Sequence, residues 1–295
     1  MRLDLVLPND GPFMMPAMES GPHFEAMGWD GLWLTDHIVG VEAFAVKHGA
    51  QWLDILIAAG HLAARTQRVR IGTGVLVLPY RDPVIAARMV ASLDLLSGGR
   101  IDLGVGTGWA RREFMAVGRG DIFDRRGAYA DEVLDVMLTC WKGGPISFQG
   151  EFFKIDKVTF AGTPAQGERV PLWIGARGLA PAPMRRAAKY ADYWHPTGLT
   201  PEQINAGGDR LDEMAGRPVK RTLRVRTDGD PSEMADMLWR YKEAGCVMVA
   251  CAFNKPQTFS EFDKAATAIY EAAKALQDES AAPRQPSGVV QPVTP

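Results

Sequence analysis

Short runs of apolar residues alternate along the chain with longer stretches in which apolar residues recur every three or four positions. Each short run predicts a β-strand, and each longer stretch predicts an amphipathic helix. "PVIAARMVASLDLLS" and "PSEMADMLWRYKEAG" show the helical pattern, and each begins with proline, where a helix needs no backbone donor. Eight strands are predicted, at residues 3–7, 31–35, 69–78, 100–105, 170–176, 192–196, 222–227 and 246–253.

The predicted strands are apolar at nearly every position, which indicates burial of both faces beneath helices. Eight strand–helix units in a chain of 295 residues favour the α/β class and a (β/α)8 TIM barrel. An open, doubly wound sheet is the alternative, because a count of strands does not show that the sheet closes. We expect a single barrel domain over residues 1–278.

Two segments depart from this alternation. Residues 143–170 are strand-like and rich in turn residues, with no space for a helix, and predict an inserted hairpin excursion over the barrel rim. Residues 279–295 contain proline, serine and glutamine without periodicity, which predicts a flexible C-terminal tail.

Charge and composition exclude several classes of partner. The formal net charge is −2, so nothing indicates binding to nucleic acid or to an anionic membrane. The first apolar run is broken at Asp4 and no run reaches the length of a membrane span, so neither a signal peptide nor a membrane helix is expected. Three cysteines are too few for a disulfide framework. These features together predict a cytoplasmic protein.

Polar residues and glycines gather directly after the predicted strands. Asp36 and His37 follow the second strand, residues 106–108 the fourth and residues 175–178 the fifth. The carboxyl ends of barrel strands build the active site, so these residues are candidates for it. Glycine there leaves space for a planar ring or a phosphate, although any single glycine can equally relieve crowding in a turn.

Asp36 and His37 form the most informative titratable pair. The histidine could serve as general acid or base or hold a cofactor ring, and the aspartate could fix its tautomer or hold the loop. A helix N-cap beside a solvated histidine is the alternative. His37 and His195 lie on separate strands without further clustered ligands, so no metal site is predicted.

The stretch "GVGTGW" has the outline of a dinucleotide-binding turn, but the third glycine of that fingerprint is missing. Depending on the register, Trp109 or Arg111 stands in its place. A bulky side chain there prevents close packing of helix on strand, so a Rossmann site is not expected.

Three longer blocks carry a family resemblance: "DGLWLTDHI", "RIGTGVLVLPYRDPVIAARMVASLDLLSGGRIDLGVGTGWARREF" and "PLWIGARGLAPAPMRRAAKYADYWHP". They resemble the luciferase-like monooxygenase superfamily and, within it, the coenzyme F420-dependent (deazaflavin) oxidoreductases. The resemblance implies a barrel that binds a flavin-type ring in its mouth. It also implies a non-proline cis peptide bond at Gly74–Val75, and catalytic Asp36 and His37 beside the ring, where the histidine handles a proton.

The same resemblance implies that the end of the fourth strand lies near the ring and that the loop after the fifth strand, with the following helix N-terminus, holds a phosphate. The predicted cofactor-binding residues are Thr73, Gly74, Val75, Gly106, Thr107, Gly108, Arg112, Gly175, Ala176, Arg177, Gly178 and Leu179. Sugar-phosphate dehydrogenases of the superfamily carry a tryptophan shortly after the histidine, near the position of Val41 here, and a glutamate where Trp109 stands. Both differences argue against a sugar phosphate as substrate.

The sequence therefore predicts an oxidoreductase that transfers a hydride between coenzyme F420 and a small organic substrate. An FMN-dependent luciferase-like monooxygenase or reductase is the alternative within the superfamily. A flavin or deazaflavin carrier without catalysis, and a scaffold without any cofactor, are alternatives of other classes. Family resemblance also leads us to expect a homodimer, and residues 41–52 are a candidate loop facing either the substrate or a second subunit.

Overall fold

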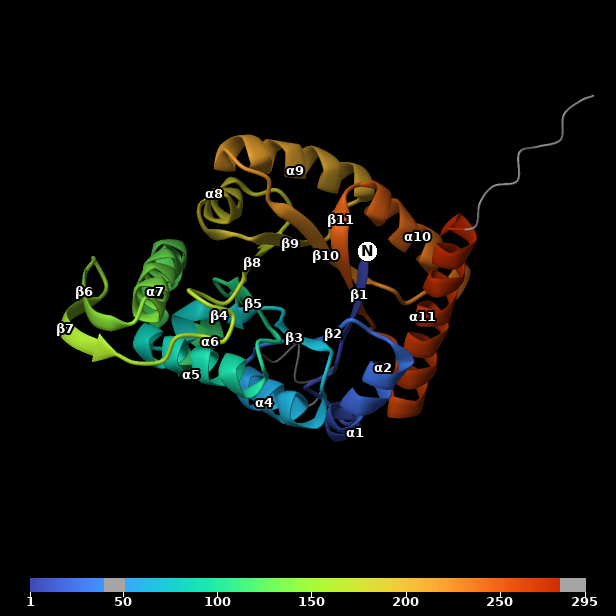
Figure 1. The fold of residues 1–295 in the computed structure, drawn as a ribbon, viewed down its shortest axis with the longest axis horizontal. Helices are drawn as coiled ribbons and strands as arrows, with labels where there is room; N and C mark the ends of the chain where they lie inside the picture. Colours follow the sequence, from blue (N-terminus) through green and yellow to red (C-terminus); the bar gives the residue numbers. More distant parts are fainter. Residues whose placement is uncertain (40–50, 282–295) are drawn as a thin grey trace, which may run out of the picture.

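Eight parallel strands form a closed barrel in the computed structural model, which describes residues 1–39 and 51–281 (Figure 1). Hydrogen bonds connect neighbouring strands in the order β3-β2-β1-β11-β10-β9-β8-β5, and pairing of β3 with β5 closes the ring. The TIM barrel is therefore confirmed, and the open sheet is wrong. The strands are β1 (Arg2–Val6), β2 (Gly31–Leu34), β3 (Arg70–Thr73) continued by β4 (Leu76–Val77), β5 (Ile101–Gly106), β8 (Leu172–Arg177), β9 (Tyr193–Thr197), β10 (Lys220–Arg226) and β11 (Cys246–Ala252).

Helices surround the barrel and cover the outer faces of its strands (Figure 1). They are α1 (Met14–Glu19), α2 (Gly21–Met27), α4 (Ile55–Arg65), α5 (Pro83–Leu96), α6 (Arg111–Ala116), α7 (Arg126–Trp141), α8 (Pro181–Tyr190), α9 (Pro201–Ala215), α10 (Pro231–Glu243) and α11 (Phe259–Ala281), with 3-10 turns at Leu78–Tyr80 and Gly120–Arg125. Asp82 and Asp230 cap α5 and α10 by accepting two backbone N–H groups each, and proline follows each cap as predicted. None of the helices within the described residues is long and apolar enough to cross a membrane.

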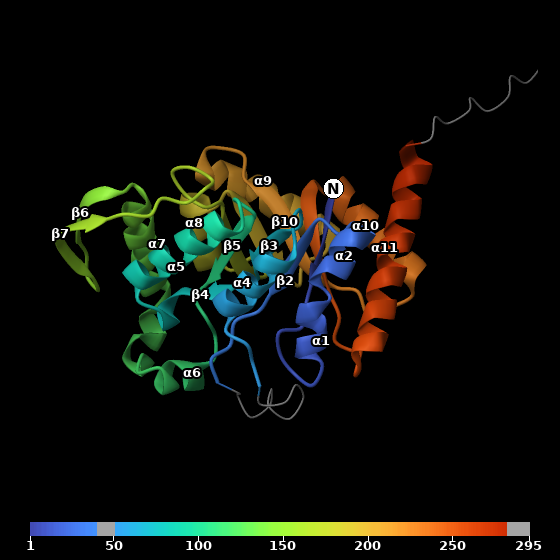
Figure 2. The same ribbon diagram turned by 60° about the horizontal axis from the view of Figure 1, so that its bottom comes forward.

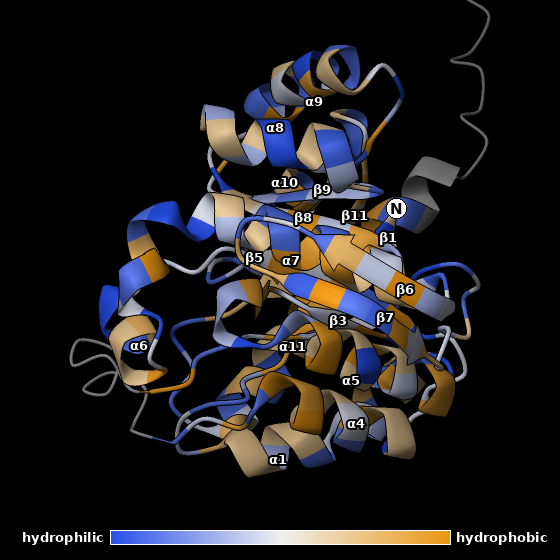
Figure 3. Cartoon of the chain, turned by 90° about the vertical axis from the view of Figure 1, so that its left-hand side faces the viewer, coloured by the Kyte–Doolittle hydropathy of each residue, from blue (hydrophilic) through white to orange (hydrophobic). Residues whose placement is uncertain are grey.

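The predicted excursion between α7 and β8 is an antiparallel hairpin of β6 (Gly144–Gln149) and β7 (Lys154–Phe160). Figure 3 shows it at the outside of the molecule, with hydrophobic and hydrophilic residues mixed along β7. The predicted tail at 279–295 begins within α11, so residues 279–281 are helical, and residues 282–295 lie outside the described part of the chain.

Large aromatic side chains fill the barrel interior. Trp33 and Trp173 are fully buried, with ring centres 5.0 Å apart, and Tyr193 stacks on Trp173 at 4.0 Å. Gly72 faces the indole of Trp33 so closely that any Cβ there would overlap it. The glycine in the third strand therefore makes space for a tryptophan from the second strand.

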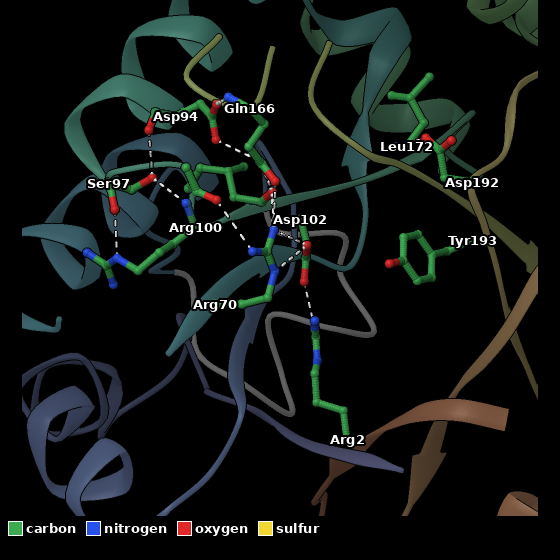
Figure 4. A network of polar contacts seen from close by, with 12 residues as sticks. Arg2, Arg70, Asp94, Ser97, Arg100, Asp102, Gln166, Leu172, Asp192 and Tyr193 are labelled. Atoms are coloured by element: carbon green, nitrogen blue, oxygen red, sulfur yellow. Dashed lines mark hydrogen bonds and ion pairs between the residues drawn. The ribbon is translucent and has the colours of Figure 1, made fainter. Parts of the chain in front are cut away.

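An ion-pair network closes the amino end of the barrel (Figure 4). Asp102 of β5 is buried and accepts hydrogen bonds from Arg2 Nη2 at 2.6 Å and from Arg70 Nε at 2.8 Å. Gln166, which follows the hairpin, accepts from Arg70 and donates to Asp94 at 2.8 Å. The network links β1, β3 and β5 to the chain segment that crosses beneath them.

Candidate active site

The carboxyl ends of the strands open on the side of the molecule where α1 and α6 lie, which is the lower side of Figure 2. Asp36, His37, Val75 and the two predicted glycine-rich segments all lie at this end, which we call the mouth. The sequence therefore placed these residues correctly at one end of the barrel. Their contacts within the mouth include several that were not predicted.

His37 is held by a carboxylate that the sequence interpretation missed. Its Nδ1 lies 3.1 Å from Oε2 of Glu113, a residue of α6 whose side chain is only 2% exposed. Glu113 Oε1 accepts the N–H of Ile38 at 2.8 Å, and Tyr80 donates its hydroxyl to Oε2 at 3.0 Å. The glutamate thus fixes both the imidazole and the backbone that follows it.

The pKa of Glu113 reflects these contacts. Burial alone would raise it, but the hydrogen bonds from His37 and from the Ile38 N–H outweigh burial, and the pKa lies below its ordinary value. Glu113 is therefore an anion at neutral pH, and a proton on Nδ1 of His37 is directed toward it. Burial and the Glu113 charge raise the pKa of Tyr80, so its hydroxyl stays protonated as a donor.

Asp36 holds the loop instead of the histidine. Its carboxylate accepts the Val77 N–H at 2.8 Å and both terminal nitrogens of Arg81, at 2.5 and 3.0 Å. Arg81 also reaches Asp54, the N-cap of α4, at 2.9 Å. Among the described residues Asp36 makes no hydrogen bond to His37, whose imidazole instead contacts the carboxylate of Glu113.

The third strand is interrupted where the resemblance implied. The Gly74–Val75 peptide bond is cis and separates β3 from β4, which confirms the predicted bulge. The Gly74 N–H donates to Leu34 O at 2.7 Å. Thr73 is buried and its hydroxyl donates to Gly104 O at 2.7 Å, so this predicted cofactor residue braces neighbouring strands.

Two predicted cofactor glycines make space for the Val75 side chain. A Cβ at Gly106 would lie 2.5 Å from Cγ2 of Val75, and a Cβ at Gly175 would lie 2.5 Å from Cγ1. Both distances are far below van der Waals contact. The glycines were expected to leave space for a cofactor ring. In the structure the Val75 side chain instead occupies the spaces beside both glycines, which we call the notches. The partly exposed valine therefore forms this part of the mouth surface.

The segment after β5 brings an aromatic side chain to the mouth. Trp109 is 57% exposed, and its ring lies 6.1 Å from the imidazole of His37. Trp52 approaches the same imidazole at 4.8 Å. Thr107 and Gly108 are partly exposed, Gly108 adopts a φ of +72°, and Arg112 is exposed on α6.

The predicted phosphate loop offers fewer donors than its glycines suggest. Residues 175–177 belong to β8 and pair with β9, and the Gly178 N–H donates to Thr197 O at 3.2 Å. Helix α8 has proline at its first and third positions, Pro181 and Pro183, which lack N–H groups. Ala180 and Ala182 retain donors at this helix start, Leu179 is partly exposed, and the Arg177 side chain is exposed.

The segment 41–50, which includes Val41 and most of the predicted loop, lies outside the described residues. No group of three or more histidine, cysteine, aspartate or glutamate side chains arranged to hold a metal occurs in the part of the chain that the structure describes. Cys140, Cys246 and Cys251 are buried thiols.

Comparison with known proteins matches residues 16–292 to the family described as luciferase-like monooxygenase. An uncharacterized protein of Mycobacterium tuberculosis is 32% identical over 214 residues, 71% of either chain. The F420-dependent glucose-6-phosphate dehydrogenase of Microbacterium testaceum is 32% identical over 72% of this chain and 61% of its own length. The pyrimidine monooxygenase RutA of Yersinia enterocolitica is 34% identical over 67% of this chain and 55% of its own length.

Solved structures share the fold at low identity. An F420-dependent secondary alcohol dehydrogenase superposes with a TM-score of 0.78 at 19% identity, over 93% of this chain and 98% of its own. Riboflavin lyase (RcaE), solved with a modified FMN, superposes with a TM-score of 0.77 at 14% identity, over 95% of this chain and 92% of its own.

Proposed function

This chain is an oxidoreductase of the luciferase-like monooxygenase family, and we propose that it transfers a hydride between coenzyme F420 and a small organic substrate. The observation that carries the proposal is the pairing, in one barrel mouth, of the Val75 bulge with a histidine held by an anionic glutamate. The F420-dependent relative from Microbacterium testaceum, aligned over 72% of this chain, supports the choice of cofactor.

The residues at the mouth fit a planar tricyclic ring with a phosphate-bearing side chain. The Val75 side chain fills the notches at Gly106 and Gly175, so this part of the mouth presents an apolar side chain instead of exposed glycine backbone. Trp109 adds an exposed aromatic face near His37. Arg177 and the N–H groups of Ala180 and Ala182 are the donors suited to the phosphate.

F420, when bound, supplies the carbon that accepts or donates the hydride. The chain positions the reactants and manages the accompanying proton, and positioning contributes a large part of the rate. His37 would exchange that proton, while Glu113 keeps the ring in one orientation. Tyr80, Arg81 and Asp36 hold the loops that carry these two groups.

FMN is the second candidate cofactor, because riboflavin lyase (RcaE), which shares the fold, was solved with a modified FMN. A tricyclic ring with a phosphate is common to both cofactors. The fold is shared equally by a structure containing F420 and by one containing modified FMN.

Parallel calorimetric titrations of the purified protein with F420 and with FMN test the proposal. We expect micromolar binding of F420 and at least tenfold weaker binding of FMN. Preference for FMN would transfer the assignment to a flavin monooxygenase or reductase, and binding of neither would remove the cofactor assignments. The His37→Asn variant then distinguishes an enzyme from a non-catalytic carrier. If the protein is an enzyme, the variant keeps its affinity for F420 and loses turnover. If the protein is a carrier, the substitution changes neither property.

We also propose that the protein forms a homodimer through α4 and α5. Both helices expose large apolar side chains, namely Ile57, Ile85, Leu95 and Leu96, which are between 54% and 83% exposed. Figure 3 shows hydrophobic colouring along these adjacent helices. Sedimentation velocity of Ile85→Glu/Leu96→Glu should show a monomer and the wild type a dimer, with Met214→Glu on α9 as the control. A monomeric wild type at micromolar concentration would contradict the proposal.

A further inference from the structure

Arg224 of β10 crosses the barrel interior just below the mouth. Its Nη1 donates a hydrogen bond of 3.2 Å to the carbonyl oxygen of Gly74 in the bulge. β10 and β3 are four strands apart around the closed ring, so they face each other across it. The guanidinium therefore lies in the centre of the barrel, directly beneath the space that the bulge shapes.

The guanidinium of Arg224 is incompletely satisfied. Within residues 1–39 and 51–281 it makes one hydrogen bond, and no carboxylate lies within 4 Å of it. A guanidinium offers five N–H donors, so most of those of Arg224 are left for solvent or for a ligand. Asp10 attracts it at longer range, while burial and the neighbouring charge of Arg226 lower its pKa.

Other enclosed arginines make more contacts within the described part of the chain. Arg81 binds two carboxylates, and Arg2 binds Asp4 and Asp102. Arg100 has no carboxylate partner among the described residues, yet its side chain donates five hydrogen bonds to oxygens of Ala63, Thr66, Val69 and Ser97. Each of these arginines thus makes several hydrogen bonds to protein groups, whereas Arg224 makes one within the described residues.

A second arginine lies on the same face of β10. Side chains alternate along a strand, so Thr222, Arg224 and Arg226 share one face. Thr222 is in contact with buried His195 of β9, which identifies this face as the interior one. Arg226, two residues closer to the carboxyl end, is exposed. The mouth is therefore flanked on this side by two positive charges at different depths.

We propose that Arg224 and Arg226 form the substrate's carboxylate subsite, so that the substrate class is small organic acids. The inference rests on the proposed function, because the subsite lies at the mouth where the hydride would be exchanged. A carboxylate matches the planar fork of a guanidinium and accepts two hydrogen bonds from it. Arg224 binds the acid group, and Arg226 attracts it and completes its neutralisation.

Calorimetric titration with malonate, with malonamide as its neutral counterpart, tests the subsite, first on the cofactor-free protein and then with saturating F420. We expect millimolar or tighter binding of malonate in at least one of these states and no detectable binding of malonamide. Arg224→Gln should weaken malonate binding about tenfold or more, because a charge-assisted bidentate contact is lost. Arg226→Gln should weaken it less and reduce its dependence on salt.

Arg185→Gln on α8 is the matched control, since it removes an exposed arginine away from β10 and should leave the affinity unchanged. Arg224→Lys keeps the positive charge and a donor for the carbonyl oxygen of Gly74. Weaker malonate binding in this variant therefore reports on recognition of the carboxylate and not on loss of the fold. Equal malonate affinity in wild type and Arg224→Gln, or no malonate binding in either state, overturns the subsite. F420 binding by the same samples tests the proposed function independently, because a failed subsite with intact F420 binding refutes only the substrate class.

Discussion

Glu113 and His37 are 76 residues apart in the chain, yet the glutamate carboxylate lies 3.1 Å from Nδ1 of the imidazole. The pair joins α6 to the segment after β2, and it is reinforced by the Ile38 N–H and the Tyr80 hydroxyl. A histidine held in this way has a fixed orientation, with its Nδ1 facing a carboxylate.

The first prediction concerns this tautomer. Because Glu113 is an anion, Nδ1 of His37 should carry a proton, which long-range ¹H–¹⁵N correlation spectra of ¹⁵N-histidine protein detect directly. Glu113→Gln removes the negative charge, so the Nδ1–H form should lose population, and turnover should fall by roughly ten- to a hundredfold. Tyr80→Phe is the control, since it keeps the carboxylate and should preserve the Nδ1 proton. An unprotonated Nδ1 in the wild type would refute the assigned role of Glu113.

The second prediction concerns the notches beneath Val75. Gly106→Ala places a methyl group 2.5 Å from Cγ2 of Val75, and overpacking of this kind costs about 1–3 kcal/mol. The bulge must shift, so cofactor affinity should fall together with stability. Adding Val75→Ala removes the clashing methyl groups and should restore most of the loss.

Urea unfolding of the single and double variants measures this coupling. Gly60→Ala is the matched control, because a Cβ there meets only Leu93 Cδ1, at an ordinary 3.8 Å, and alanine favours helix α4. If Gly106→Ala is as stable as the wild type, or if Val75→Ala rescues nothing, the seating of valine in the notch is wrong.

A third prediction separates the two roles considered for Asp36. The side chain of Asp36 is fully buried, and its partner Arg81 is only 12% exposed. Asp36→Asn leaves that arginine without its main partner, and breaking a buried pair in this way costs about 3–5 kcal/mol. Asp54→Asn, at the half-exposed second partner of Arg81, should cost under about 1 kcal/mol while its remaining oxygen still caps α4. Chemical denaturation should rank the variants in this order, and a catalytic Asp36 would instead show near-normal stability with lost turnover.

The fourth prediction is a pH dependence that arises from His195. Burial, together with the positive charges of Arg224 and Arg2, lowers the pKa of His195 from 6.5 to about 3. Between pH 6.5 and about pH 3, the His195 side chain is protonated in the unfolded chain and neutral in the folded chain. The contribution of this pKa shift to the free energy of unfolding is therefore complete above pH 6.5. It is lost as the pH falls toward 3, by about 1.4 kcal/mol per pH unit.

His195→Gln removes this titration, so its free energy of unfolding should change less with pH than that of the wild type by the same slope. Urea denaturation at pH 7.5, 6.5, 5.5 and 4.5 measures the difference. His23→Gln provides the control, because His23 is 51% exposed and should leave the slope nearly intact. Parallel pH profiles for wild type and His195→Gln would contradict a neutral, buried His195.

The barrel could be predicted from the sequence because its strands are apolar on both faces and its helices carry proline and acidic caps in their first turns. These are local features, and the strand-like, turn-rich pattern of residues 143–170 located the hairpin in the same local way. The partners of His37 and Asp36 could not be predicted in the same way, because Glu113 and Arg81 are brought to them by barrel closure. Asp36 is adjacent to His37 in the chain, but adjacent residues of an extended segment point in opposite directions.

Gly106 and Gly175 show the same limit of prediction from sequence. Residues 106 and 175 were recognised as places where space is needed, yet sequence cannot show what occupies that space. Val75 fills it from a third strand, in a bulge whose position was indicated only by family resemblance.

The filled interior of the barrel has a consequence for molecular traffic. Trp33, Trp173 and Tyr193 occupy the space below the mouth, and the Asp102 ion pairs lock the opposite end. The barrel is therefore open at the mouth and closed at its amino end. Under the proposed function, cofactor and substrate would both enter and depart through this one opening, so we expect the molecule that binds deeper to arrive first and to leave last.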